Sequence, residues 1–113
     1  MAKNNAAALA VPSAPEYLSG SLRVRFEELA PKLVAMGTLT DLEADLLAKL
    51  IISENNYLKI SNEVQRSLAA GDAETAGKWI TAQDKLTKQI LTISAELGLT
   101  PAARKARGII LNI

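Results

Sequence analysis

Asp41 and Asp45 could hold a cation together, because they lie one helical turn apart. Both also fall in the first turns of an expected helix, where the helix dipole favours acidic side chains without any chemical role. The 113 residues include no His and no Cys, which excludes disulfides, thiol nucleophiles and zinc sites built on those ligands. No glycine-rich phosphate loop accompanies the acids. We therefore expect a protein that is not an enzyme and that needs no cofactor and no metal.

Contact with phosphate groups is the other chemistry that the sequence offers. Residues 97–113 contain three basic side chains and no acid, whereas residues 41–63 contain five acids and two lysines. Lys and Arg without acidic neighbours bind nucleic acid by releasing counterions, although they also stabilise helix C-termini, and both interpretations stay open. Nearby acids leave a solvated helix face as the alternative for the other basic residues. The candidate DNA-binding residues are Arg104, Lys105 and Arg107 near the end of the sequence, Lys85 and Lys88 further upstream, and Arg23 and Arg25 near the beginning.

The composition indicates helices packed on helices. Hydrophobic residues make up 49% of the chain but aromatic residues only 4%, and the formal net charge is +1. Such a chain can bury one modest core and is not a polycation as a whole. We predict an all-α fold with a flexible N-terminal arm over residues 1–18 and a single helical domain over residues 19–113.

The first helix is expected over residues 19–36, with Ser19 as its N-cap. Pro31 interrupts its apolar stripe, so we expect a kink or a break near Ala30, because a mid-helix proline loses a hydrogen bond and clashes with the preceding turn. Gly37 suits a left-handed end to this helix.

A long antiparallel helical hairpin is expected next, over residues 40–70 and 72–97. Thr40 and Glu43 form a capping-box pattern at its beginning, and "AAGD" makes its turn. "LTPAAR" then predicts a short helix over residues 100–107, before a hydrophobic tail over residues 108–113.

Self-assembly is the function that this hairpin favours. Two long helices carry more apolar surface than they can cover between themselves, although the first helix and the tail could cover the rest. Ile80 and Leu91 add apolar flanks to the second of them. The candidate oligomerisation residues are Tyr57, Val64, Trp79, Leu86, Ile90, Ile93 and Leu97, and we expect a homo-oligomeric ring, since closed symmetry hides repeated patches.

Two stretches of the sequence resemble the small subunit of tailed-phage terminase, in the group that carries an "LGLTPAAR" ending. The opening pattern is similar at Pro15, Leu18, Leu29, Pro31, Leu33, Gly37, Leu39 and Thr40. The C-terminal signature is similar at Glu96, Gly98, Leu99, Thr100, Pro101 and Arg104. The chain departs from the family pattern where the second hairpin helix begins, with "AAGDAETAGKWI" in place of an Asn-Pro junction.

The resemblance implies a ring-forming helical protein without enzymatic activity. It implies that the partners are viral double-stranded DNA, the large terminase subunit with its ATPase and nuclease, and further copies of the chain. It also implies work in the host cytoplasm rather than in the mature virion. No stretch is apolar enough for a membrane span. A helical scaffold or regulator that binds only protein partners is the alternative.

Overall fold

The computed structural model describes residues 10–99, which fold as helices joined by short connections. In that range the chain forms α2 (Gly20–Ala35), the short 3-10 helix η1 (Asp41–Glu43), α3 (Ala44–Ala69) and α4 (Ala73–Glu96), and no strand. The predicted all-helical class is therefore confirmed for this part of the chain. The expected helix 100–107, the tail 108–113 and the first nine residues of the arm lie outside the described residues.

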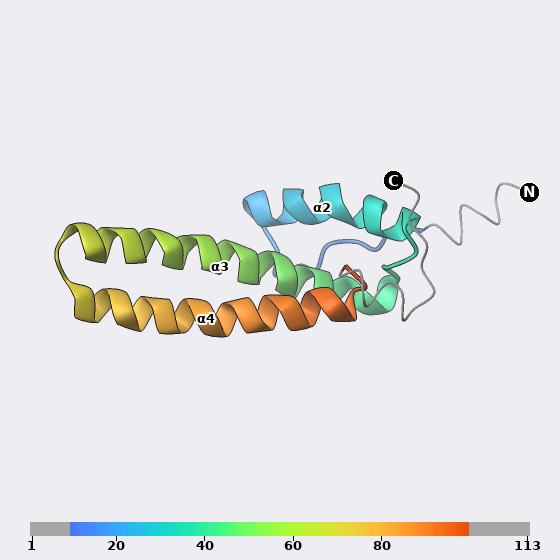
Figure 1. Ribbon diagram of the computed structural model, residues 1–113. Coiled ribbons are helices and arrows are strands. Elements are labelled where there is room, and N and C mark those ends of the chain that lie inside the picture. The colour runs from blue at the N-terminus through green and yellow to red at the C-terminus, as the bar shows by residue number, and fades with distance from the viewer. Residues whose placement is uncertain (1–9, 100–113) are drawn as a thin grey trace, which may run out of the picture.

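The helices α3 and α4 run side by side in opposite directions and form the long axis of the molecule (Figure 1). The structure measures 64 × 31 × 23 Å along its principal axes. Gly71 makes the turn between the two helices with φ of 73°, a left-handed value that residues with a Cβ rarely adopt. Asp72 then caps α4, because its side chain accepts a hydrogen bond of 3.1 Å from the backbone nitrogen of Thr75.

The contact between α3 and α4 follows a stripe of α4 residues spaced by three and four. Gln83, the polar member of this stripe, donates a 2.6 Å hydrogen bond to the hydroxyl of Ser61 across the hairpin. Trp79 and Leu86, four before and three after Gln83, are half-buried. The stripe of α4 that contains Trp79, Gln83 and Leu86 therefore faces the neighbouring helix of the same chain.

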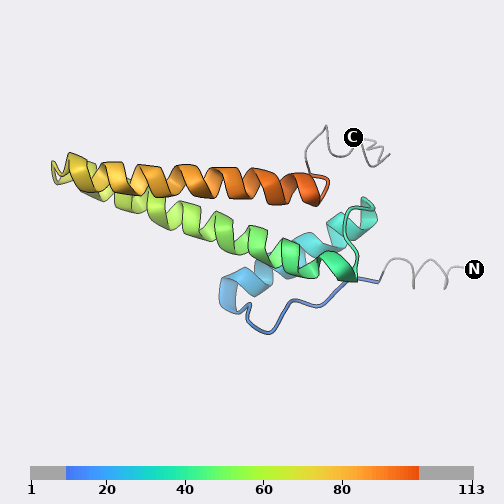
Figure 2. The same ribbon diagram turned by 90° about the horizontal axis from the view of Figure 1, so that it is seen from below.

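The helix α2 covers one end of the hairpin only. In Figures 1 and 2, α3 lies between α2 and α4, and α2 reaches along α3 from the open end of the hairpin only part of the way to the turn. The helix continues through Pro31 to Ala35, so the proline does not end it, and the kink expected there stays a prediction.

The hydrophobic core lies where α2 packs on α3 and where the last turns of α4 reach the same region. Twelve buried side chains form one cluster: Leu18, Phe26, Ala30, Leu33, Val34, Leu39, Leu47, Ala48, Leu50, Ile51, Ile93 and Leu97. Toward the turn, the buried hydrophobic residues of the described chain are Val64 and Ala76 alone. Tertiary burial therefore stabilises one half of the hairpin far more than the other.

The beginning of α3 is built as the sequence predicts. The capping box is present, with the backbone nitrogen of Thr40 donating to Oε1 of Glu43 at 2.7 Å. This arrangement satisfies backbone donors that have no partner inside the helix. The difference from the expected helix is its first turn, because Asp41–Glu43 form the 3-10 helix η1 before α3 begins at Ala44.

Residues 10–18 belong to the predicted flexible arm, and they pack against the helices. Pro12 and Leu18 are buried. The hydroxyl of Tyr17 donates a 2.8 Å hydrogen bond to Oδ1 of Asp45, 28 residues further along the chain. Residues 10–18, called the strap from here on, are thus fixed by the burial of Leu18 and by the hydrogen bond of Tyr17.

Candidate functional site

An apolar groove of about 640 Å³ lies between α2 and α4, across the middle of α3. Its walls come from the first turns of α2, from α3 between Ile51 and Leu58, and from α4 between Thr87 and Leu91. The groove lies where α2 begins beside the middle of α3, on the stretch where α3 runs between α2 and α4 (Figure 2).

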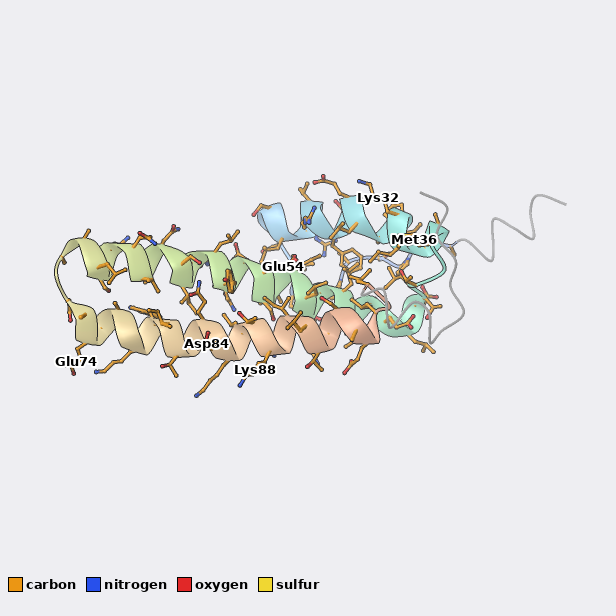
Figure 3. The ribbon with its side chains drawn as sticks, viewed as in Figure 1. Lys32, Met36, Glu54, Glu74, Asp84 and Lys88 are labelled. Atoms are coloured by element: carbon orange, nitrogen blue, oxygen red, sulfur yellow. The ribbon has the colours of Figure 1, made fainter. Side chains whose placement is uncertain are left out.

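The groove is open to solvent, because two leucines that line it are more than half exposed. Leu58 is 63% exposed and Leu91 is 59% exposed, although both line the groove. Polar side chains stand beside them: Arg25 from α2, and Glu54 from the side of α3 that faces α2 (Figure 3). An apolar floor with a few polar groups at its edge is the usual construction of a binding groove.

The structure divides the seven candidate oligomerisation residues into two groups. Val64, Ile93 and Leu97 are buried inside the single chain, so a second copy cannot contact them without opening the hairpin. The other four are half-buried: Tyr57, Trp79, Leu86 and Ile90. Tyr57 and Ile90 also line the groove. The structure therefore buries three of the seven within one chain, and a role of the other four in oligomerisation stays a prediction.

The exposed apolar surface of the hairpin consists of Leu58 and Leu68 on α3 with Ile80 and Leu91 on α4. The sequence identified Ile80 and Leu91 as flanks but missed Leu58 and Leu68 as surface residues. Both belong to the apolar pattern of α3, and only the packing of α2 and α4 determines which members of that pattern are covered. No signal in the sequence distinguishes the exposed members of this pattern from the covered ones.

The lysines of α4 project into solvent. Lys85 and Lys88 are exposed and lie three residues apart, which puts them on one face of the helix. Lys88 points away from α3, on the outside of the hairpin (Figure 3). Lys78 is also exposed and pairs loosely with Glu74 at 3.8 Å. The outer face of α4 can therefore approach a large anion without obstruction from the rest of the described chain.

The two arginines of α2 have different surroundings. Arg23 donates from Nε to the carbonyl oxygen of Leu18 at 2.9 Å and from its terminal Nη2 to that of Pro15 at 3.0 Å. Its guanidinium is thus occupied in holding the strap. Arg25 is exposed at the edge of the groove. The structure does not bring these arginines together with Lys85 and Lys88, and Arg104, Lys105 and Arg107 lie outside the described residues.

The strap occupies one of the two acids, Asp41 and Asp45, that could hold a cation together. Asp45 accepts the hydrogen bond from Tyr17, and burial together with this bond and the nearby negative charge raises the pKa of the Tyr17 hydroxyl above 10.0. Among residues 10–99, no group of three or more acidic side chains could hold a metal ion. In the same range no helix is long and apolar enough to cross a membrane.

The comparison with known families gives one match. The family model described as phage terminase, small subunit, matches residues 23–110, which is most of the chain and includes nearly all of α2 and the whole hairpin. No curated protein and no solved structure matches the chain.

Proposed function

Because the chain belongs to the family of phage terminase small subunits, which gives it a role in phage DNA packaging, we propose that it is a non-catalytic protein that forms a homo-oligomeric ring. We propose further that it recognises the viral double-stranded DNA and regulates the large terminase subunit. Its place of work is then the host cytoplasm, and it is absent from the mature virion. The observation that carries this proposal is the half of the hairpin near the turn, which α2 leaves uncovered.

Self-assembly is supported by the exposed apolar side chains of that half. Leu68 is 51% exposed and Ile80 is 42% exposed, on a pair of helices with little buried apolar surface of its own. Exposed apolar surface of this kind marks contact sites between proteins. A repeated contact between unlike faces of the same chain closes into a ring when its rotation closes.

DNA binding is supported by the outer face of α4. Lys85 and Lys88 are both exposed, and Lys88 points away from α3 (Figure 3). A ring repeats both charges once per copy, and the proposed contacts of Arg104, Lys105 and Arg107 would add three more. Contacts of this type go to phosphates, so they position the protein without reading the sequence.

Two measurements on the same samples test the proposal. Light scattering should give a mass that is a multiple of the 12.0 kDa chain at micromolar concentration. Affinity for duplex DNA should fall steeply with salt, with a logarithmic slope of about 0.9 for each phosphate contact. The double change Lys85→Ala and Lys88→Ala should lower that slope by about 2 for each copy that contacts the DNA, whereas Lys59→Ala, an exposed lysine of α3, serves as the control.

The basic residues beyond Leu99 are tested in the same assay. Arg104 and Arg107 are three residues apart and would share a helix face, so their double change to Ala should weaken binding more than Lys105→Ala. A lowered melting temperature with an unchanged salt slope would instead assign these arginines to structure.

The results also separate the alternative function. A scaffold that binds only protein would assemble but show no salt-dependent affinity for DNA. A chain that stays at 12 kDa at micromolar concentration would contradict the ring. The regulatory part is tested by the ATPase rate of the large subunit with and without this chain, and purified chain alone should hydrolyse no ATP and cleave no DNA.

A further inference from the structure

No apolar segment within residues 10–99 fills the groove between α2, α3 and α4. Ile51 forms its floor and is 2% exposed, while Leu58 and Leu91 at its edges are more than half exposed. The volume of about 640 Å³ lies in the range of pockets that hold several apolar groups. Removing such side chains from water contributes roughly 25 cal/mol per Å², so a covered groove is favoured.

The sequence beyond Leu99 supplies an apolar segment on the same chain. Residues 108–113 read "GIILNI", with three isoleucines and one leucine and no charged side chain. β-branched residues of this kind favour an extended conformation, which suits a segment laid along a groove rather than another helix. Residues 100–107 contain three basic residues and join this segment to Leu99.

The geometry at the end of α4 turns the chain away from the helix axis at Gly98. Gly98 has φ of 71°, and the backbone nitrogen of Leu99 donates to the carbonyl oxygen of Ser94 at 2.8 Å. This is the glycine-terminated helix ending in which the chain leaves the helix axis sharply. Leu99 itself packs against the core, so the chain leaves α4 on the side where the core lies.

The distances permit the segment to reach the groove. Leu91 precedes Glu96, the last residue of α4, by five positions and Thr87 precedes it by nine, so they lie about 8 Å and about 14 Å back along the helix. Eight linking residues, 100–107, span up to about 26 Å when extended and about 12 Å when helical. In either conformation the link is long enough to span the distance back to the level of Leu91.

We propose that the groove holds residues 108–113 of the same chain. A tethered segment has an effective concentration of the order of millimolar, so it occupies the groove before a second copy at micromolar concentration can. The docked segment covers Leu58 and Leu91 and fixes the basic residues 104–107 beside α4. The inference does not depend on the proposed function, since it concerns a contact within one chain.

The test uses the absence of cysteine from the chain. Thr87 and Thr92 form a matched pair on α4: both are exposed, and each hydroxyl donates to the carbonyl oxygen four residues earlier at 3.0 Å. Thr87 lines the groove, whereas Thr92 lies about 140° away around the helix. Each is changed to Cys together with Asn112→Cys, which leaves the apolar residues of the segment intact.

Under mild oxidation, the Thr87→Cys, Asn112→Cys chain should form an intrachain disulfide about tenfold faster than the Thr92→Cys, Asn112→Cys chain. Thr92 is closer to the segment along the chain, so an undocked segment would give the opposite order or equal rates, and either result would overturn the proposal. Dimers linked between chains as the main product would also overturn it, because the groove would then hold the segment of another copy.

A second variant keeps the result interpretable. Adding Ile110→Ser and Leu111→Ser to the Thr87→Cys, Asn112→Cys chain should reduce its disulfide rate to that of the Thr92 control, with helix content by circular dichroism unchanged. An unchanged rate would overturn the proposal, because apolar docking would not be the cause. The reaction reports the segment whatever the mass or DNA affinity of the protein, so its failure is distinguishable from failure of the proposed function.

Discussion

The two halves of the hairpin are built from similar helices but are stabilised differently. Near the open end, Leu47, Leu50 and Ile51 of α3 are nearly inaccessible because α2 packs over them. Near the turn, α3 and α4 have only each other as neighbours within residues 10–99, and Leu68 and Ile80 stay exposed. The comparison teaches that a regular apolar pattern does not reveal how many neighbours a helix has. The covered half holds the hydrophobic core, and the uncovered half keeps apolar side chains exposed, which we propose as the surface for partners.

The largest expected effect comes from the covered half. Phe26→Ala removes a side chain that is 1% exposed, which should lower the free energy of unfolding by about 3 to 5 kcal/mol. Val24→Ala, two residues earlier on the same helix but 53% exposed, is the matched control and should cost well under half as much. Thermal and urea unfolding measure both, and similar losses for the two variants would contradict the assignment of the core to this half.

The uncovered half should respond in assembly rather than in folding. Ile80→Asp puts a charge into the proposed contact between copies, where a buried apolar side chain contributes about 1.5 to 3 kcal/mol. We expect association to weaken by about 10- to 100-fold, measured by light scattering over a concentration series. Thr81→Asp, also exposed on α4, is the control.

Ile80 is a sharper probe of assembly than Trp79. Trp79 lies on the stripe that faces α3, so Trp79→Asp should also open the hairpin. If Ile80→Asp left the mass of an oligomer unchanged while lowering the melting temperature, the uncovered half would be a folding surface after all, and the comparison between the halves would fail.

The two arginines of α2 repeat the contrast on a smaller scale. Arg23→Ala removes two hydrogen bonds from a charged group to the carbonyls of Pro15 and Leu18, so it should cost about 1 to 2 kcal/mol of stability. It should also speed hydrogen exchange at the amide of Leu18. Arg25→Ala should change stability by less than about 0.5 kcal/mol, because the side chain is exposed.

The same pair of variants sharpens the DNA surface. If Arg23→Ala lowered the salt slope of DNA binding without lowering stability, the guanidinium would contact phosphate rather than the strap. Loss of stability at an unchanged slope is the expected result.

The sequence was sufficient for the features that depend on local chemistry. The all-helical class, the capping box at Thr40 and Glu43, and the turn at Gly71 each follow from residues within a few positions of one another. These signals are local because helix ends are satisfied by neighbouring side chains and by glycine. The family followed from motifs of the same short range, and the family model matches residues 23–110.

The site could not be predicted as well, because it depends on distant residues. The seven-residue spacing of Leu86 and Ile93, and of Ile90 and Leu97, predicts an apolar seam, but the same spacing suits a neighbouring helix in the chain or in another copy. Arg23 resembles Arg25 in the sequence, and only the strap, fixed through Tyr17 to Asp45, separates their roles. Burial of this kind is decided by tertiary packing.

The smallest expected effect is the pH dependence of the cap at the turn end of α4. A side-chain hydrogen bond with Thr75, and the bond that the backbone nitrogen of Thr75 donates to the Asp72 carboxylate, lower the pKa of Asp72 below 3.8. Since the folded pKa lies below the unfolded one, the contribution of the cap is complete above the unfolded pKa and is lost as the pH falls through the folded pKa.

Asp72→Asn keeps a side-chain oxygen that can accept from the helix, so it should preserve the cap but remove this acid dependence below about pH 4. Asp72→Ala should lose the cap at every pH. Melting curves of the three chains between pH 2 and pH 6 measure the difference. In the part of the chain that the structure describes, α3 is the one element packed beside this turn, so the change should appear as fraying of the uncovered half while hydrogen exchange in the covered half stays constant. Equal exchange changes in both halves would mean that the hairpin unfolds as one unit and that α2 stabilises its whole length.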